Sequence, residues 1–160
     1  MTRALEEDRK FMREALKLAE QAGDDIPVGA LIVRDGEIIA AAANEKEKEQ
    51  DPTAHAEIVA IKRACQVTGS WRLGGATLYT TLEPCPMCAE AILQCRVDKV
   101  VFGAYDLISG ALGSRFNLFE KGRLYSPPRV VGGVLEDECR DLLKQFFRRK
   151  KHLESSLESS

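Results

Sequence analysis

The sequence predicts an α/β fold of three layers, α/β/α, in which a mixed sheet of five strands carries helices on both faces. In the middle of the chain, short apolar segments alternate with segments of helical periodicity, which is typical of strands joined by helical crossovers. Near the start, Asp35-Gly36 separates two apolar segments, a strong signal for an antiparallel hairpin. The two patterns together predict that the sheet is mixed.

The elements follow from periodicity and from turn residues. Apolar segments predict strands at 27–33, 37–43, 76–82, 97–103 and 129–134. Helical spacing and stop signals predict a first helix that ends at Gly23, then helices at 55–67, 86–95 and 136–152. The polar segment 44–53 is predicted to be a loop, as is the glycine-punctuated segment from the fourth strand through Gly122.

The length favours one domain. A chain of 160 residues, of which 44% are hydrophobic, suffices for one core and is short for two. We expect a single domain over 1–152 and a low-complexity tail over 153–160, which is interpreted as a frayed end or a remnant of cloning.

Composition excludes some classes of protein. No segment approaches the roughly 18 uninterrupted apolar residues of a membrane helix, and the early acidic residues argue against a secretory signal. We therefore expect a cytoplasmic protein without a membrane partner. The net charge of −2 and the pI near 5.8 argue against nonspecific nucleic-acid binding, although Arg148–Lys151 is a local basic run.

Cysteine and histidine usage narrows the choice of metal ligands. The five cysteines are odd in number, which argues against a disulfide framework, and only Cys85 and Cys88 have the close spacing of ligands. The chain has two histidines, of which His152 lies in the basic end, so His55 is the histidine available inside the fold. The other cysteines fall within apolar patterns: Cys65, Cys95 and Cys139.

Two helix starts carry the candidate chemistry. His55 begins one predicted helix, and Cys85 and Cys88 begin another, where i and i+3 thiolates point at one ion and gain from the helix dipole. Three protein ligands leave a position open for water, as in catalytic zinc sites, where the pKa of that water falls towards about 7. Glu57, two residues after His55, is predicted to take the water proton and return it to a leaving amine.

Each half of this pattern alone has a simpler interpretation. A C-x-x-C pair also occurs in redox sites and as half of a structural zinc site, and H-x-E also arises from helix capping. Together, in this order and with Pro84 and Pro86 on either side of Cys85, the two halves predict a zinc-dependent hydrolytic deaminase of nucleobases.

The same residues carry a resemblance. H-x-E followed by P-C-x-x-C is the signature of zinc nucleobase deaminases, and the chain resembles the cytidine deaminase superfamily, within it the bacterial tRNA adenosine deaminases. The similarity covers roughly residues 8–150. It includes the segments 28–30, 51–57, 77–79, 81–85, 87–88, 100–104 and 146–148.

The resemblance implies conversion of adenosine to inosine at the wobble position (A34) of a tRNA anticodon, by a homodimer with one zinc ion per subunit. Its implied partner is an anticodon stem-loop, that of tRNA-Arg. It implies that zinc is bound by His55, Cys85 and Cys88, and that Glu57 is catalytic. The implied substrate-binding residues are Pro27, Val28, Asn44, Ala56 and Asp106.

Several interpretations stay open at this level. Asn44 also suits the Asx turn that ends a strand, Asp106 also suits a solvated loop, and Arg148–Lys151 also suits a solvated helix end. Ile108 and the segment 127–129 depart from the residues common in the family near its RNA-binding surfaces. The alternatives are therefore a deaminase of free nucleobases, nucleosides or nucleotides, of the guanine or cytosine type, and a zinc-stabilised interaction module.

Overall fold

The computed structural model describes residues 2–120 and 125–158. Its helices are α1 (Arg3–Ala19), the 3-10 turn η1 (Glu20–Ala22), α2 (Lys46–Glu49), α3 (Ala56–Thr68), α4 (Pro86–Gln94) and α5 (Glu136–Glu158). Its strands are β1 (Gly29–Arg34), β2 (Glu37–Ala43), β3 (Ala76–Leu82), β4 (Lys99–Ala104) and β5 (Arg129–Val131).

The strands form one mixed sheet in the order β2-β1-β3-β4-β5. Strand β1 runs antiparallel to β2 and β3, whereas β3, β4 and β5 are parallel to one another. The turn between β1 and β2 places Asp35 and Gly36 at φ 52° and 75°, which is the left-handed pair that a two-residue hairpin turn requires. The predicted five-stranded mixed sheet is confirmed.

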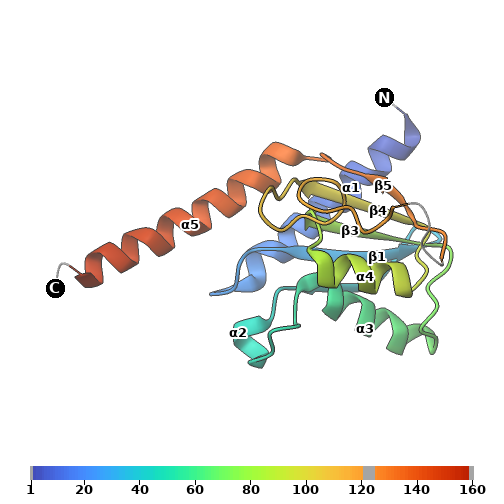
Figure 1. Ribbon diagram of the computed structural model, residues 1–160, viewed down its shortest axis with the longest axis horizontal. Helices are drawn as coiled ribbons and strands as arrows, with labels where there is room; N and C mark the ends of the chain where they lie inside the picture. Colours follow the sequence, from blue (N-terminus) through green and yellow to red (C-terminus); the bar gives the residue numbers. More distant parts are fainter. Residues whose placement is uncertain (1, 121–124, 159–160) are drawn as a thin grey trace.

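Helices cover both faces of this sheet. Figure 1 shows α3 and α4 on one face, α1 on the other, and α5 running from the sheet out beyond it. Side chains of β1 alternate between the two cores: Ala30 and Ile32 pack on the side of α3, whereas Leu31 and Val33 pack on the side of α1. Both layers are therefore anchored on the same central strand.

Gly29 marks the closest approach of α1 to the sheet. A Cβ at this position would overlap the Ala15 carbonyl oxygen and lie 2.8 Å from the Ala19 nitrogen, both backbone atoms of α1. We expect Gly29→Ala to lower the free energy of unfolding by about 3 kcal/mol, the upper end for overpacking, because α1 has to move. Urea unfolding measures this loss. Gly74→Ala is the control, since a Cβ there meets nothing within 4 Å; equal losses in the two variants would contradict the explanation.

The predicted loop 44–53 is wrong in part, because residues 46–49 form α2. The sequence of α2 has no apolar periodicity, and the helix is stabilised by a residue that lies 22 positions earlier in the chain. The buried carboxylate of Asp25 accepts a hydrogen bond from the Glu47 backbone nitrogen at 3.1 Å. The last strand is shorter than the predicted 129–134, since Gly132 and Gly133, the latter at φ 81°, follow directly after Val131.

Helix α5 is longer than predicted. It continues from the expected end at His152 to Glu158, so residues 153–158 of the predicted tail are helical, with exposed side chains. No glycine or proline interrupts this segment. The end of the predicted loop through Gly122 and the last two residues of the tail lie outside the described residues. Within the described part of the chain, no helix is both long and apolar enough to cross a membrane.

Candidate zinc and substrate site

Two helix starts bring the metal-ligating side chains together. His55 is the N-cap residue of α3, Cys85 is the N-cap residue of α4, and Cys88 lies in the first turn of α4. His55 Nδ1 lies 3.6 Å from Cys85 Sγ and 3.5 Å from Cys88 Sγ, and the three ligand atoms lie within 4.8 Å of one another. The neighbouring α3 and α4 start at the same end of the sheet, which explains the convergence of ligands 30 and 33 residues apart.

This arrangement fits a zinc ion. Tetrahedral zinc with bonds of about 2.1 Å to nitrogen and 2.3 Å to sulfur separates those ligands by roughly 3.6 Å, which matches both observed distances. One imidazole and two thiolates are a common donor set for zinc. No other cluster of at least three such side chains occurs in the residues described, and this one offers three ligands. His55, Cys85 and Cys88 are therefore placed to bind one zinc ion and leave a coordination position open.

The electrostatics of the site favour a thiolate at Cys85. Hydrogen bonding from the Cys88 thiol, followed by that from His55, lowers the pKa of Cys85 to about 4 in spite of burial. The thiolate of Cys85, together with burial, raises the pKa of Cys88. The hydrogen bond to Cys85 also raises the pKa of His55, whereas burial and the nearby Lys46 ammonium oppose that rise. A negative charge is thus already concentrated where the cation binds.

Glu57 lies in the first turn of α3, beside the ligands. Its side chain is 4% exposed, and this burial raises the pKa of the carboxyl group to about 7. Glu57 and the ligands His55 and Cys85 line the same cavity. The sequence-predicted catalytic carboxyl group and the predicted metal site therefore share one cavity.

The cavity has a volume of about 200 Å³. This is below the roughly 300–1,000 Å³ of sites for drug-sized ligands and suits a single flat heterocycle. It lies at the carboxyl ends of β2, β3 and β4. Its lining includes the predicted residues Val28, Asn44, His55, Glu57, Cys85 and Asp106, and the unpredicted residues Ile26, Lys46, Leu82, Glu83 and Ser109.

Two predicted substrate-binding residues do not line this cavity. Pro27 is buried and lines a second cavity, between the end of α1 and Phe146 of α5. Ala56 is fully buried, and its backbone nitrogen donates a hydrogen bond of 2.7 Å to Asn44 Oδ1. Both residues lie behind the cavity wall.

The Asn44 side chain is held by two backbone groups. Its Oδ1 accepts from the Ala56 nitrogen, and its Nδ2 donates to the Ile26 carbonyl oxygen at 2.9 Å. An amide has two donor hydrogens and two acceptor lone pairs, so one of each remains for a ligand. Asn44 therefore does not form the local Asx turn that was an open interpretation of the sequence, because its hydrogen-bond partners lie 12 and 18 residues away.

Asp106 combines a local role with a place on the cavity wall. Its Oδ1 accepts from the backbone nitrogens of Ile108 and Ser109, at 3.0 and 3.1 Å, which fixes the turn after β4. Its own backbone nitrogen donates to Glu83 Oε1 at 3.1 Å. Sequence reasoning missed Glu83, whose one sequence signal is its position directly before Pro84-Cys85.

The remaining cysteines contribute to the hydrophobic core. Cys95 and Cys139 are 4% and 1% exposed, and Cys65, on α3, is partly buried and packs against the core. Burial raises the pKa of Cys95 to about 11 and that of Cys139 to about 12. The burial of Cys95 and Cys139 confirms the prediction that they occupy core positions, and their thiols stay protonated near neutral pH.

The sequence profile of the cytidine and deoxycytidylate deaminase zinc-binding region matches residues 5–104. That match spans the three ligands, Glu57 and Asn44. The chain belongs to this deaminase family. Its members bind zinc through the matched region, so the profile and the geometry of the three ligands agree on the metal.

Relatives within the deaminase family are similar to this chain in length as well as in sequence. The tRNA-specific adenosine deaminase of Bacillus subtilis is 51% identical over 149 residues, which cover 91% of this chain and 92% of the relative. A solved structure from work on A-to-I editing by tRNA:A34 deaminases superimposes with a TM-score of 0.80 at 42% identity, covering 83% and 98% of the two chains. The guanine deaminase structure from Bacillus subtilis has 40% identity and a TM-score of 0.60, covering 71% of each chain.

Proposed function

We propose that this deaminase converts adenosine to inosine at the wobble position (A34) of a tRNA anticodon. The observation that carries the proposal is the cavity of about 200 Å³ in which buried Glu57 lies beside His55 and Cys85, two of the three clustered metal ligands. The 51% identity to a tRNA-specific adenosine deaminase over nearly the whole of both chains supports the choice of substrate.

The reaction exchanges an amine for the oxygen of water. His55, Cys85 and Cys88 would hold a zinc ion, which when bound would supply a water activated for attack, with its pKa lowered to about 7. Glu57 accepts the proton of this water as the oxygen adds to C6 of the purine. It then delivers the proton to the exocyclic nitrogen, the C6–N bond breaks, and ammonia leaves. The burial of Glu57 keeps the carboxyl group directed at the reacting atoms and away from bulk water.

The walls of the cavity orient the base. Asn44 has one donor and one acceptor position left for the purine edge, and Ala56 contributes by holding the amide of Asn44. Ile26, Val28 and Leu82 form the apolar wall. Pro27 acts indirectly, by restricting the backbone between Ile26 and Val28. Asp106, which lines the cavity, contacts the RNA near the target nucleotide in this proposal.

The substrate we propose is an anticodon stem-loop, that of tRNA-Arg. Anticodon loops present unstacked bases, so extrusion of one base costs only a few kcal/mol. The exposed basic run Arg148–Lys151, which lies within α5 and not at its end, suits the phosphates of the stem. We further propose a homodimer with one zinc ion per subunit, which acts in the cytoplasm.

Lys46 is the one lysine or arginine on the cavity wall, which otherwise carries the carboxylates of Glu57, Glu83 and Asp106 among its described residues. A phosphate at the cavity mouth needs such a cation. We expect Lys46→Gln to weaken stem-loop binding about 3- to 10-fold at 0.1 M salt, and to reduce the slope of log K against log salt by about 0.7–0.9, the value of one phosphate contact. Fluorescence anisotropy across a salt series measures both.

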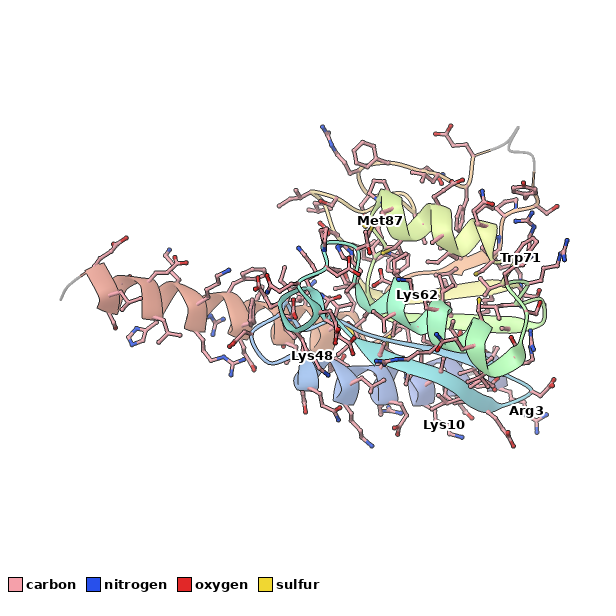
Figure 2. All side chains as sticks on the ribbon, turned by 90° about the horizontal axis from the view of Figure 1, so that it is seen from below. Arg3, Lys10, Lys48, Lys62, Trp71 and Met87 are labelled. Atoms are coloured by element: carbon pink, nitrogen blue, oxygen red, sulfur yellow. The ribbon has the colours of Figure 1, made fainter. Side chains whose placement is uncertain are left out.

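Lys48→Gln is the matched control. Lys48 lies on the same short helix (Figure 2) and does not line the cavity. The control removes the same net charge, so a purely long-range effect would change both variants equally. An unchanged salt slope in Lys46→Gln would contradict the phosphate contact.

A deaminase of free guanine is the second candidate, because the guanine deaminase structure shares 40% identity with the chain. A substrate panel separates the two candidates. The zinc-loaded protein is incubated with the stem-loop, guanine, adenosine and cytidine, and the products are separated by chromatography. If the stem-loop is the only substrate that is deaminated, the result supports the proposed tRNA substrate. Xanthine formed from guanine, with the stem-loop unchanged, would show that the protein is instead a deaminase of free guanine.

A further inference from the structure

Glu83 is a buried carboxylate that the proposed reaction does not use. Its side chain is 2% exposed, and it lines the cavity two residues before the zinc ligand Cys85. No lysine or arginine pairs with it in the described part of the chain. A buried carboxylate without a cation is costly unless hydrogen bonds satisfy it. The origin of those bonds therefore indicates its role.

Among the described residues this carboxylate accepts four hydrogen bonds, all from the segment after β4. Oε1 accepts from the Asp106 nitrogen at 3.1 Å and from Ser114 Oγ at 2.5 Å. Oε2 accepts from the nitrogens of Leu112 and Ser114, both at 3.1 Å. One side chain thus closes residues 106–114 into a fixed loop, which we call the Glu83 clamp.

The loop follows the carboxylate closely. A Cβ on Gly110 would lie 2.5 Å from Glu83 Cδ and 2.6 Å from Oε1, so only glycine lets the backbone pass at this point. The clamped loop presents Asp106 and Ser109 to the cavity. The clamp therefore connects the chain segment that carries Cys85 with the segment that forms the mouth of the cavity.

The carboxylate has no capacity left for chemistry. Two carboxylate oxygens provide about four acceptor positions, and four hydrogen bonds occupy them. Glu83 cannot accept a substrate proton without losing part of the loop. Its role is geometric, in contrast to that of Glu57.

We propose that Glu83 is a positioning residue, which holds Asp106 and Ser109 at the distance from the metal site that the substrate requires. The inference rests on the proposed function for its kinetic consequence and on the hydrogen bonds for its structural part. It predicts that a defect in the clamp weakens substrate binding more than it slows the chemical step.

Glu83→Gln tests the clamp with little change of shape. The amide NH2 turns to Ser114 Oγ, which is the only one of the four partners able to accept, and the Asp106 N–H loses its acceptor. We expect KM for the stem-loop to rise about 10-fold, with kcat changed less than about 3-fold and zinc content unchanged. Ser114→Ala is the control: it removes one donor and leaves the three backbone bonds, so KM should change less than about 2-fold.

A double-mutant cycle separates positioning from general destabilisation. If Glu83 acts through Asp106, Glu83→Gln adds less than about 2-fold to the KM of Asp106→Ala. Additive effects, or a lowered melting temperature with KM unchanged, would overturn the inference.

Hydrogen exchange provides a readout that needs no substrate. In Glu83→Gln, the amides of Asp106, Leu112 and Ser114 should lose protection while those of α3 keep it. Unchanged protection of these amides would overturn the clamp. A wild type that makes no inosine yet loses this protection in the variant would reject the proposed function and leave the clamp established.

Discussion

We expect Glu57→Gln to abolish inosine formation while zinc stays bound. Glutamine has nearly the shape of glutamate but cannot accept a proton and return it, so the turnover number should fall by at least about 10³-fold. The ligands His55, Cys85 and Cys88 are untouched, and the variant should hold one zinc ion per chain. Turnover of the stem-loop and metal analysis of the same preparation measure the two effects.

Glu47→Gln is the control for this substitution. Glu47 is an exposed carboxylate on α2, outside the cavity lining, and the same change there should leave turnover unaltered. Turnover of Glu57→Gln within about 10-fold of the wild type would show that another group transfers the proton. Loss of zinc from this variant would instead assign Glu57 to the metal site.

Cys88→Ala has the second-largest expected effect, the loss of both zinc and activity. Cys88 Sγ is fully buried and lies 3.5 Å from His55 Nδ1, so its removal leaves two ligands at the centre of the site. We expect less than about one tenth of the zinc content of the wild type, no measurable turnover, and a melting temperature that no longer rises when zinc is added. Zinc release detected with a colorimetric chelator and thermal unfolding with and without zinc measure these effects.

Cys65→Ala is the matched cysteine control. Cys65, on α3, packs against the core and is not part of the metal cluster, so this variant should retain one zinc ion and full turnover. A Cys88→Ala protein that kept stoichiometric zinc would contradict the ligand assignment.

The metal site could be predicted from the sequence because its signals are local. The spacing of Cys85 and Cys88 places both thiols on one helix start, and the scarcity of histidine leaves His55 as the third ligand. The hairpin at Asp35-Gly36 and the alternation of strands with helices likewise depend on neighbouring residues.

The residues that were missed depend on contacts between distant segments. The four hydrogen bonds of Glu83 come from residues 23 to 31 positions further along the chain, and no periodicity encodes them. Helix α2 likewise needs the carboxylate of Asp25, 22 residues before its partner. Lys46 appeared to belong to a polar loop, and only this short helix places it on the cavity wall.

In the proposed reaction, water replaces the amine of the wobble adenosine at the zinc site of this chain. The most direct test is a reaction of the zinc-loaded protein with an anticodon stem-loop in water enriched in oxygen-18, followed by mass analysis of each nucleotide. We expect one inosine, at position 34, which carries the heavy oxygen, and none in a parallel reaction with Glu57→Gln. Inosine without the heavy oxygen, or a stem-loop that remains unmodified, would contradict it.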